Sequence, residues 1–178
     1  MMQNEQNLRF NFVTNALVQD ITTLNTKVFH VMVFGTKNIT FRSIKIITPK
    51  DSPNTDGIQI GHSSAITTVD ASIETGDDCV CIGDGSEQVT ITSVTCELGH
   101  GISIGSLEKY NNELPVNGIF VKKSTLTNTL TGVRIKSWPA SLPGVANNVH
   151  FEDITMNNVS DLVLIDQGYC QWNQCTIE

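Results

Sequence analysis

A short apolar pattern recurs along this chain at intervals of 23 to 30 residues. The clearest copy is formed by Ile39, Phe41, Ile44 and Ile46, so the apolar positions follow one another at steps of two, three and two. Copies of this spacing begin at Ala16, Ile39, Ile66, Val89, Ile119 and Val149. Internal repeats of this length are typical of solenoids, whose repeats bury their apolar faces against neighbouring repeats.

Each copy is followed by a second short run of apolar residues that is typical of a β-strand. These runs are Val31–Val33, Ile58–Ile60, Val80–Ile82, Ile102–Ile104, Val133–Ile135 and Leu162–Ile165. No segment shows a sustained helical period. We therefore predict one all-β domain over residues 1–178, a right-handed single-stranded parallel β-helix of about six coils, with ladders of Ile and Val as its core.

Three ionisable residues share one position relative to the second strands. Asp56, Asp78 and His100 lie 22 residues apart, and each stands two residues before the first apolar residue of its strand. If the coils stack in register, the three residues form a column, with neighbours about 4.8 Å apart. Asp77 precedes the column by one residue and is expected to point elsewhere around the same turn.

Two cations lie one coil further on. Arg134 and Lys136 alternate with Val133 and Ile135, so a period of two places the cations outside when the apolar residues are inside. The result is a patch of three carboxylates, one imidazole and two cations. Acid–base chemistry needs a proton donor and a proton acceptor, and crowded carboxylates raise one another's pKa. The cations would bind an anionic substrate.

Each of these features also has an ordinary structural interpretation. The Asp56–Gly57 pair is common in turns. Asp77 and Asp78 could cap turns or bind calcium as oxygen ligands. His100 could be a hydrogen-bonded turn residue, and Arg134 and Lys136 a solvated strand face. Their common register on adjacent coils favours a functional site over these separate explanations.

Charge and hydropathy exclude several functions. The formal net charge of −7 argues against a role in nucleic-acid binding, which needs basic patches. No apolar run approaches the roughly 20 residues of a membrane span. The first residues, Met1–Glu5, do not show the basic and then apolar pattern of a signal peptide.

Five cysteines allow more than one arrangement. The preferred pairing is Cys79 with Cys96 and Cys170 with Cys175, which leaves Cys81 as a free thiol, although spacing alone does not fix connectivity. Disulfides would require an oxidising compartment. The alternative is five buried thiols. Asn38 and Asn158 each begin a triplet of the N-glycosylation acceptor type.

Four short motifs resemble the signature of a known family. They are Asn54-Thr55-Asp56, Gly76-Asp77-Asp78, Gly99-His100-Gly101 and Arg134-Ile135-Lys136, and in this order they resemble the polygalacturonases, glycoside hydrolase family 28. The segments 52–58, 101–107 and 165–175 are similar to plant members, especially pollen-type exopolygalacturonases. The resemblance implies a parallel β-helix that hydrolyses α-1,4 bonds of pectin with inversion and needs no metal or other cofactor.

The resemblance also implies a role for each site residue. Asp77 matches the general acid, Asp56 and Asp78 match the pair that activates water, and His100 matches a residue that supports the acid. Arg134 and Lys136 match residues that bind substrate carboxylates. Asn54 and Tyr169 match further positions of the substrate site.

Members of that family are usually about twice as long, and they begin with a signal peptide and further coils. We therefore expect the chain to lack N-terminal coils and a cap, and to expose an open end near Phe10 and Phe12. A complete protein of this kind is expected to be a monomer in the plant cell wall. Two other readings stay open, an inactive pectin-binding fragment and a calcium-dependent pectate lyase of the same fold.

Overall fold

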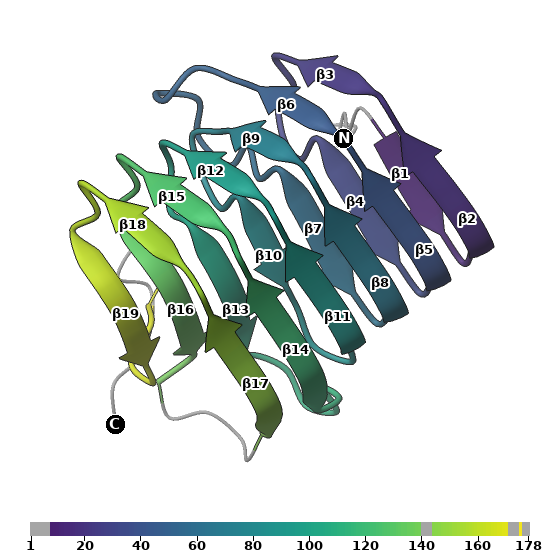
Figure 1. Cartoon of the computed structure of the whole chain (residues 1–178). Coiled ribbons are helices and arrows are strands. Elements are labelled where there is room, and N and C mark those ends of the chain that lie inside the picture. The colour runs from purple at the N-terminus through teal and green to yellow at the C-terminus, as the bar shows by residue number, and fades with distance from the viewer. Residues whose placement is uncertain (1–7, 140–143, 171–174, 176–178) are drawn as a thin grey trace.

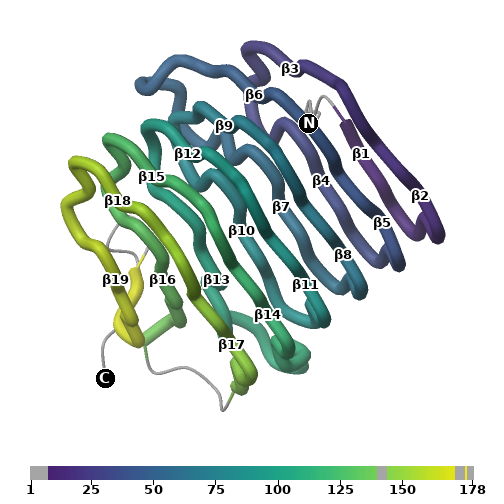
Figure 2. The backbone as a smooth tube through the Cα atoms, in the orientation of Figure 1, coloured from purple at the N-terminus to yellow at the C-terminus, as the bar shows by residue number. Residues whose placement is uncertain are grey.

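A computed structural model describes residues 8–139, 144–170 and 175. Every regular element in these ranges is a β-strand, and the 19 strands wind into a parallel β-helix (Figure 1). Figure 2 shows the backbone passing from coil to coil along one axis, with the first described coil and the last at opposite ends. No helix in the described part is long and apolar enough to span a membrane.

The strands form three parallel sheets, and each coil contributes one strand to each sheet. Sheet A contains β1 (Leu8–Asn11), β4 (Val31–Phe34), β7 (Ile58–Gly61), β10 (Val80–Ile82), β13 (Ile102–Leu107), β16 (Thr131–Ser137) and β19 (Asp161–Asp166). Sheet B contains β2 (Thr14–Gln19), β5 (Lys37–Arg42), β8 (Ser64–Val69), β11 (Glu87–Thr92), β14 (Val116–Lys122) and β17 (Ala146–Glu152). Sheet C contains β3 (Thr22–Leu24), β6 (Lys45–Ile47), β9 (Ser72–Glu74), β12 (Thr95–Glu97), β15 (Thr125–Thr127) and β18 (Thr155–Asn157).

The strand register confirms the repeat found in the sequence. In sheet B the paired residues are Ala16, Ile39, Ile66, Val89, Ile119 and Val149, the six predicted repeat starts. In sheet A the pairs run through Val31, Ile58, Val80, Ile102, Val133 and Val163. The predicted all-β parallel β-helix of about six coils is therefore confirmed, with three strands in each coil.

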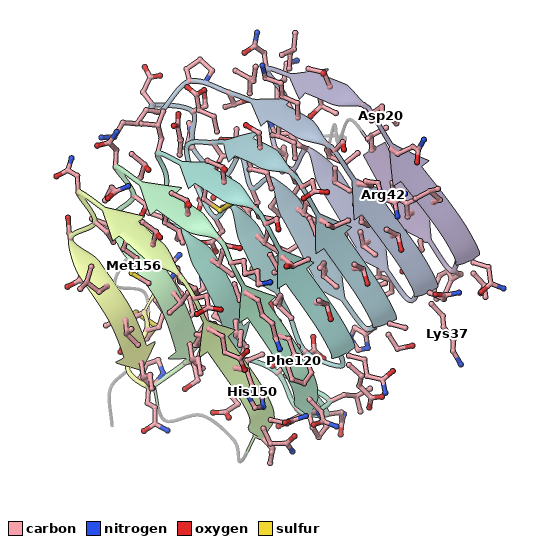
Figure 3. The ribbon with its side chains drawn as sticks, viewed as in Figure 1. Asp20, Lys37, Arg42, Phe120, His150 and Met156 are labelled. Atoms are coloured by element: carbon pink, nitrogen blue, oxygen red, sulfur yellow. A yellow bond between two sulfur atoms is a disulfide. The ribbon has the colours of Figure 1, made fainter. Side chains whose placement is uncertain are left out.

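The uneven step of three in the apolar pattern marks a corner of the coil. Alternation places two residues of sheet B inside, and the chain then turns, so that the next inward residue, such as buried Ile44, stands just before the strand of sheet C. The turning residue has a positive φ in every coil, at Asp20, Ser43, Asp70, Ser93, Lys123 and Asp153. Figure 3 shows Asp20 at this corner of the first coil. Asp and Asn are the residues other than glycine that most readily adopt this backbone conformation.

Apolar ladders fill the interior between the sheets. Ile39, Ile66, Val89 and Ile119 of sheet B are completely buried and face the equally buried ladder of Ile58 and its neighbours in sheet A. β-branched side chains suit such a stack because they pack well against the strands above and below.

The disulfide arrangement agrees with the preferred pairing. Cys79 bonds to Cys96 and joins sheets A and C across the interior, Cys170 bonds to Cys175, and Cys81 is a buried free thiol. The reading with five buried thiols is therefore wrong.

A buried histidine spans the interior nearer the N-terminus. The Nδ1 atom of His30 lies 2.6 Å from the Thr23 hydroxyl, and its Nε2 atom lies 2.7 Å from the Thr48 hydroxyl. Burial lowers the pKa of His30 from 6.5 to about 4. The two hydroxyls therefore hold a neutral imidazole between sheets A and C.

The end coils leave apolar side chains open. At the first coil Phe12 is 75% exposed, as expected for that region, whereas Leu8 and Phe10 are half-buried. At the last coil Val163 and Ile165 are 63% and 69% exposed, although they continue the ladder that contains buried Val133. In the described part, the larger exposure of core-facing residues is at the C-terminal coil.

The His30 site predicts a dependence of stability on pH. The unfolded chain binds a proton at His30 below pH 6.5 and the folded chain only below about 4, so stability falls as the pH drops through this window. The loss from this residue is about 3 kcal/mol. Free energies of unfolding of the parent and of His30→Gln, measured from pH 7 to 4, test this.

His30→Gln is expected to be less stable than the parent at pH 7 and to show a flatter decline as the pH falls. His150→Gln serves as the control, because His150 stacks on Phe120 on the outer face of sheet B, away from the interior (Figure 3). The same pH dependence in His30→Gln and the parent would contradict the assignment.

The open C-terminal coil predicts self-association of a chain of these 178 residues. Exposed inward-facing apolar residues beside an open strand edge favour pairing with another chain. Replacing Val163→Ser and Ile165→Lys together should shift sedimenting species toward the monomer. Leu17→Lys, an exposed position on the outer face of sheet B, should have no such effect. A parent that stays monomeric at all concentrations would show the prediction to be wrong.

Candidate active site

A cleft of about 950 Å³ lies on the outer face of sheet A. Its floor is a column of residues that face outward between the core positions, and they pair in the order Met32, Gln59, Cys81, Ser103 and Arg134. Loops before and after the sheet A strands form the walls. All eight residues predicted from the sequence line this cleft, namely Asn54, Asp56, Asp77, Asp78, His100, Arg134, Lys136 and Tyr169.

Coil stacking brings Asp56 and Asp78 together. The backbone N–H of Gly57 donates to the Asp78 carbonyl at 2.9 Å, so the two turns are in register. Oxygen atoms of the two carboxyl groups and the Cys81 Sγ atom lie within 4.8 Å of one another. Both carboxyl groups are buried at the bottom of the cleft. The column predicted from the spacing is therefore correct for these two residues.

The prediction that the Asp77 side chain points elsewhere around the turn is wrong. Its Oδ1 atom accepts a hydrogen bond from the Asp78 backbone N–H at 2.8 Å and lies 2.7 Å from the Nδ1 atom of His100. The side chain therefore turns back to the column, because the N–H of the next residue and the imidazole of the next coil both draw its oxygen inward.

His100 reaches Asp77 because the backbones of the two turns come unusually close. The His100 N–H donates to the Asp77 carbonyl at 2.9 Å. Gly99 has a positive φ, and a Cβ at that position would clash with the Asp77 carbonyl oxygen. The glycine before His100 therefore permits the contact between the imidazole and the carboxylate.

Asp78 is the centre of a buried ionic network. Its Oδ1 atom lies 2.6 Å from Nη2 of Arg134, and its Oδ2 atom lies 3.0 Å from Nζ of Lys136. The Ser103 hydroxyl donates to Oδ1 at 2.7 Å and accepts from Nε of Arg134 at 2.6 Å. The two predicted surface cations are thus buried by the cleft walls, and both are paired with one carboxylate.

The network sets the charge of its members. Burial alone would lower the pKa of Lys136 and of Arg134, yet the adjacent Asp78 carboxylate raises both pKa values above their ordinary range. Both groups therefore stay positively charged at the floor of the cleft.

The pKa values of the other two carboxyl groups, Asp56 and Asp77, shift in opposite directions. Burial, together with the negative charges of Asp78 and Asp77, raises the pKa of Asp56 well above its ordinary value. Burial would also raise the pKa of Asp77, but the hydrogen bond and the charge of His100 hold it below its ordinary value. In the free site Asp56 therefore holds a proton more readily than Asp77, which shares its hydrogen bond with His100.

Tyr169 and Asn54 lie at the edges of the same cleft. The Tyr169 ring centroid is 4.9 Å from Nζ of Lys136, and the Tyr169 N–H donates to the Ser137 carbonyl at 3.0 Å. Asn54 is exposed and has a positive φ in the loop between β6 and β7. Both side chains are available to a molecule lying in the cleft.

Several residues at or beneath the cleft were not predicted as site residues from the sequence, among them Ser103, Lys109 and Tyr110. Ser103 bridges Asp78 and Arg134, and its place between Ile102 and Ile104 in an alternating strand was a signal for an outward-facing side chain. Lys109 and Tyr110 line the wall from the loop after β13. They lie outside the repeat, so the spacing gave no indication of their position.

The donor set does not resemble a calcium site. Two groups of three metal-ligand residues occur in the described part, Asp56 with Asp78 and Cys81, and Asp77 with Asp78 and His100. Calcium takes six to eight oxygen ligands. Each group here offers only two carboxylates, and both oxygens of Asp78 already contact a cation. The arrangement is suited to acid–base chemistry.

Known proteins are similar in sequence to this chain. The chain is 56% identical over 169 residues to a polygalacturonase of Gossypium barbadense, covering 95% of this chain and 42% of that protein. It is 55% identical over 172 residues to an exopolygalacturonase of Oenothera organensis, covering 97% and 48%. The chain thus spans less than half the length of these curated relatives.

Solved structures have the same fold. A polygalacturonase from Erwinia carotovora ssp. carotovora superposes with a TM-score of 0.83 at 32% identity, covering 92% of this chain and 43% of that one. An endo-xylogalacturonan hydrolase from Aspergillus tubingensis gives a TM-score of 0.85 at 29% identity, covering 94% and 47%.

The model of the glycosyl hydrolases family 28 matches residues 2–178. Because that match runs through every coil that supplies a residue to the cleft, the chain belongs to glycosyl hydrolases family 28 as a homologue of the polygalacturonases.

Proposed function

We propose that this chain carries the catalytic centre of an exo-acting polygalacturonase, which hydrolyses the α-1,4 bonds between galacturonate units of pectin with inversion. The observation that carries the proposal is one cleft in which three carboxyl groups and an imidazole adjoin two buried cations. The exo mode is supported by the similarity to the exopolygalacturonase of Oenothera organensis.

Asp77 acts as the general acid in this proposal. Its hydrogen bond to His100 contains one proton, which lies either on Nδ1 or on the carboxyl group. Transfer of that proton to Asp77 gives the acid that protonates the leaving oxygen, and a proton taken up from solvent then restores the hydrogen bond between His100 and Asp77. A positioned acid of this kind contributes about 10²–10⁴-fold to the rate.

Asp56 and Asp78 bind and activate the attacking water together. Their oxygens lie within 4.8 Å of one another, close enough for both carboxyl groups to contact one water molecule. The two therefore act as one unit on the same water. A proton on Asp56, whose pKa is raised by burial, must leave before the pair accepts one from water.

Arg134 and Lys136 hold the substrate carboxylate, while Tyr169 and Asn54 contact the sugar from the edges of the cleft. The two cations face one buried aspartate, so a net positive charge is left for an acid sugar. The disulfides support folding in an oxidising compartment, in keeping with a protein of the cell wall that works as a monomer.

A substrate with a good leaving group distinguishes the acid from the base. Asp77→Asn should lower turnover of polygalacturonate by about 10²–10⁴-fold and should largely preserve cleavage of a dinitrophenyl galacturonide, whose leaving group needs no proton. Asp56→Asn should lower both rates. The asparagine at position 77 can still accept the Asp78 N–H bond, so the turn is retained. Turnover on both substrates is the measurement.

Asp70→Asn, at a corner far from the cleft, is the matched control. If Asp56→Asn still cleaved the dinitrophenyl galacturonide and Asp77→Asn did not, Asp56 would be the acid and Asp77 would belong to the base. Binding of oligogalacturonate without release of reducing sugar by the parent would show a pectin-binding protein instead of a hydrolase. Loss of activity on adding a chelator would indicate the calcium-dependent lyase.

Methyl esterification tests the role of the two cations. Esterified pectin lacks the negative charges that Arg134 and Lys136 are proposed to bind, so it should be the poorer substrate. Lys136→Met should weaken binding of de-esterified chains by about 1–3 kcal/mol and should change binding of the ester little. Lys37→Met on the outer face of sheet B is the control (Figure 3). Equal parent rates on both substrates would count against this role.

A further inference from the structure

The wall of the cleft continues past Lys136 as a row of cations and aromatic rings. Nζ of Lys136 lies 4.9 Å from the ring centroid of Tyr169, and this ring meets the ring of Trp138 edge to face at 6.4 Å. Nζ of Lys109 lies 4.4 Å from the Trp138 ring and 5.3 Å from the Tyr110 ring. Two aromatic rings thus stand between the two ammonium groups along the row.

Lys109 differs from the cations on the floor in how its charge is paired. Arg134 and Lys136 are both paired with Asp78, whereas no carboxylate oxygen of the described residues lies within 4.0 Å of the Lys109 ammonium. Glu113, one of the two acidic residues in the same loop, is engaged by the backbone instead. Lys109 is exposed and lines the cleft, so its charge is available to an anion there.

Glu113 fixes the loop that carries Lys109. Its Oε2 atom accepts from the Glu108 N–H at 2.5 Å, and its Oε1 atom accepts from the N–H groups of Lys109 and Tyr110, both at 3.0 Å. Three consecutive N–H groups are therefore bound to one carboxylate. The backbone at Lys109 is held in place, and the indole of Trp138 then orients the ammonium group.

We propose that Lys109 binds the carboxylate of a second galacturonate unit and that Trp138 is its positioning residue. The inference rests on the proposed function, because it assumes an acid polysaccharide in the cleft. The buried pair Arg134 and Lys136 binds one carboxylate of the polysaccharide. Because two aromatic rings separate Lys136 from Lys109, Lys109 binds the carboxylate of another unit of the same polysaccharide. Tyr110, which is 65% exposed beside Lys109, offers an apolar face to the C–H face of that sugar.

A second cation site predicts that affinity depends on substrate length. Lys109→Met keeps the length of the side chain and removes its charge. Against the Asp77→Asn background, it should lower affinity for long oligogalacturonates by about tenfold and leave affinity for galacturonic acid unchanged. In the otherwise unmodified chain it should raise KM and leave kcat unchanged. Calorimetric titrations with oligomers of increasing length measure the first effect, and reducing-sugar assays the second.

Four further variants separate this role from general effects. Lys109→Arg should restore the affinity for long oligomers. Trp138→Phe retains an aromatic face for the ammonium and should bind more tightly than Trp138→Leu. Lys123→Met, an exposed lysine at the corner between β14 and β15, removes the same net charge away from the cleft and should match the parent. Circular dichroism of each variant checks that the fold is retained.

The outcomes distinguish this inference from the proposed function. A parent that neither binds nor cleaves oligogalacturonate overturns the proposed function, and this inference with it. A parent that binds them, with Lys109→Met equal to it at every length, overturns the Lys109 assignment alone. Equal losses for Lys109→Met and Lys123→Met, or a loss as large for the single sugar as for the long chain, also overturn that assignment.

Discussion

Hydrogen bonds between successive coils are the interaction on which the rest of this structure depends. Each strand bonds only to the strand of the coil above and the coil below, so residues 22 to 31 positions apart become direct neighbours. A shift of one residue in any strand would send every inward side chain outward. The aliphatic ladders prevent that shift, and the same register places Asp56 beside Asp78.

The chemistry of the cleft depends on how the charges of its buried residues are paired. Asp78 faces two cations and a serine hydroxyl, so its charge is tolerated in a buried place. Asp56 lies beside it without a cation of its own, and therefore tends to keep a proton. Asp77 has His100 as its partner and tends to lose one. Three carboxyl groups on two successive coils thereby acquire three different environments.

The sequence predicted the backbone of this site better than its side chains. Register follows from the apolar repeat, which is why the stacking of Asp56 on Asp78 and the outward direction of Arg134 and Lys136 could be predicted. The direction of Asp77 depends on a local bond to the next N–H, and the spacing gave no signal for it. The burial of the cations depends on the cleft walls, whose loops lie outside the repeat. Lys109 was missed for the same reason.

The unequal length of the coils has a consequence for how such a cleft can change. In the coils from Val31 to Ile58 and from Ile102 to Val133, the extra residues fall in the loops 48–57 and 108–115, which border sheet A. Both loops contribute to the cleft lining. Insertions and deletions there would alter the shape of the cleft without disturbing a single ladder of the core. The scaffold and the selectivity of the groove can therefore evolve almost independently.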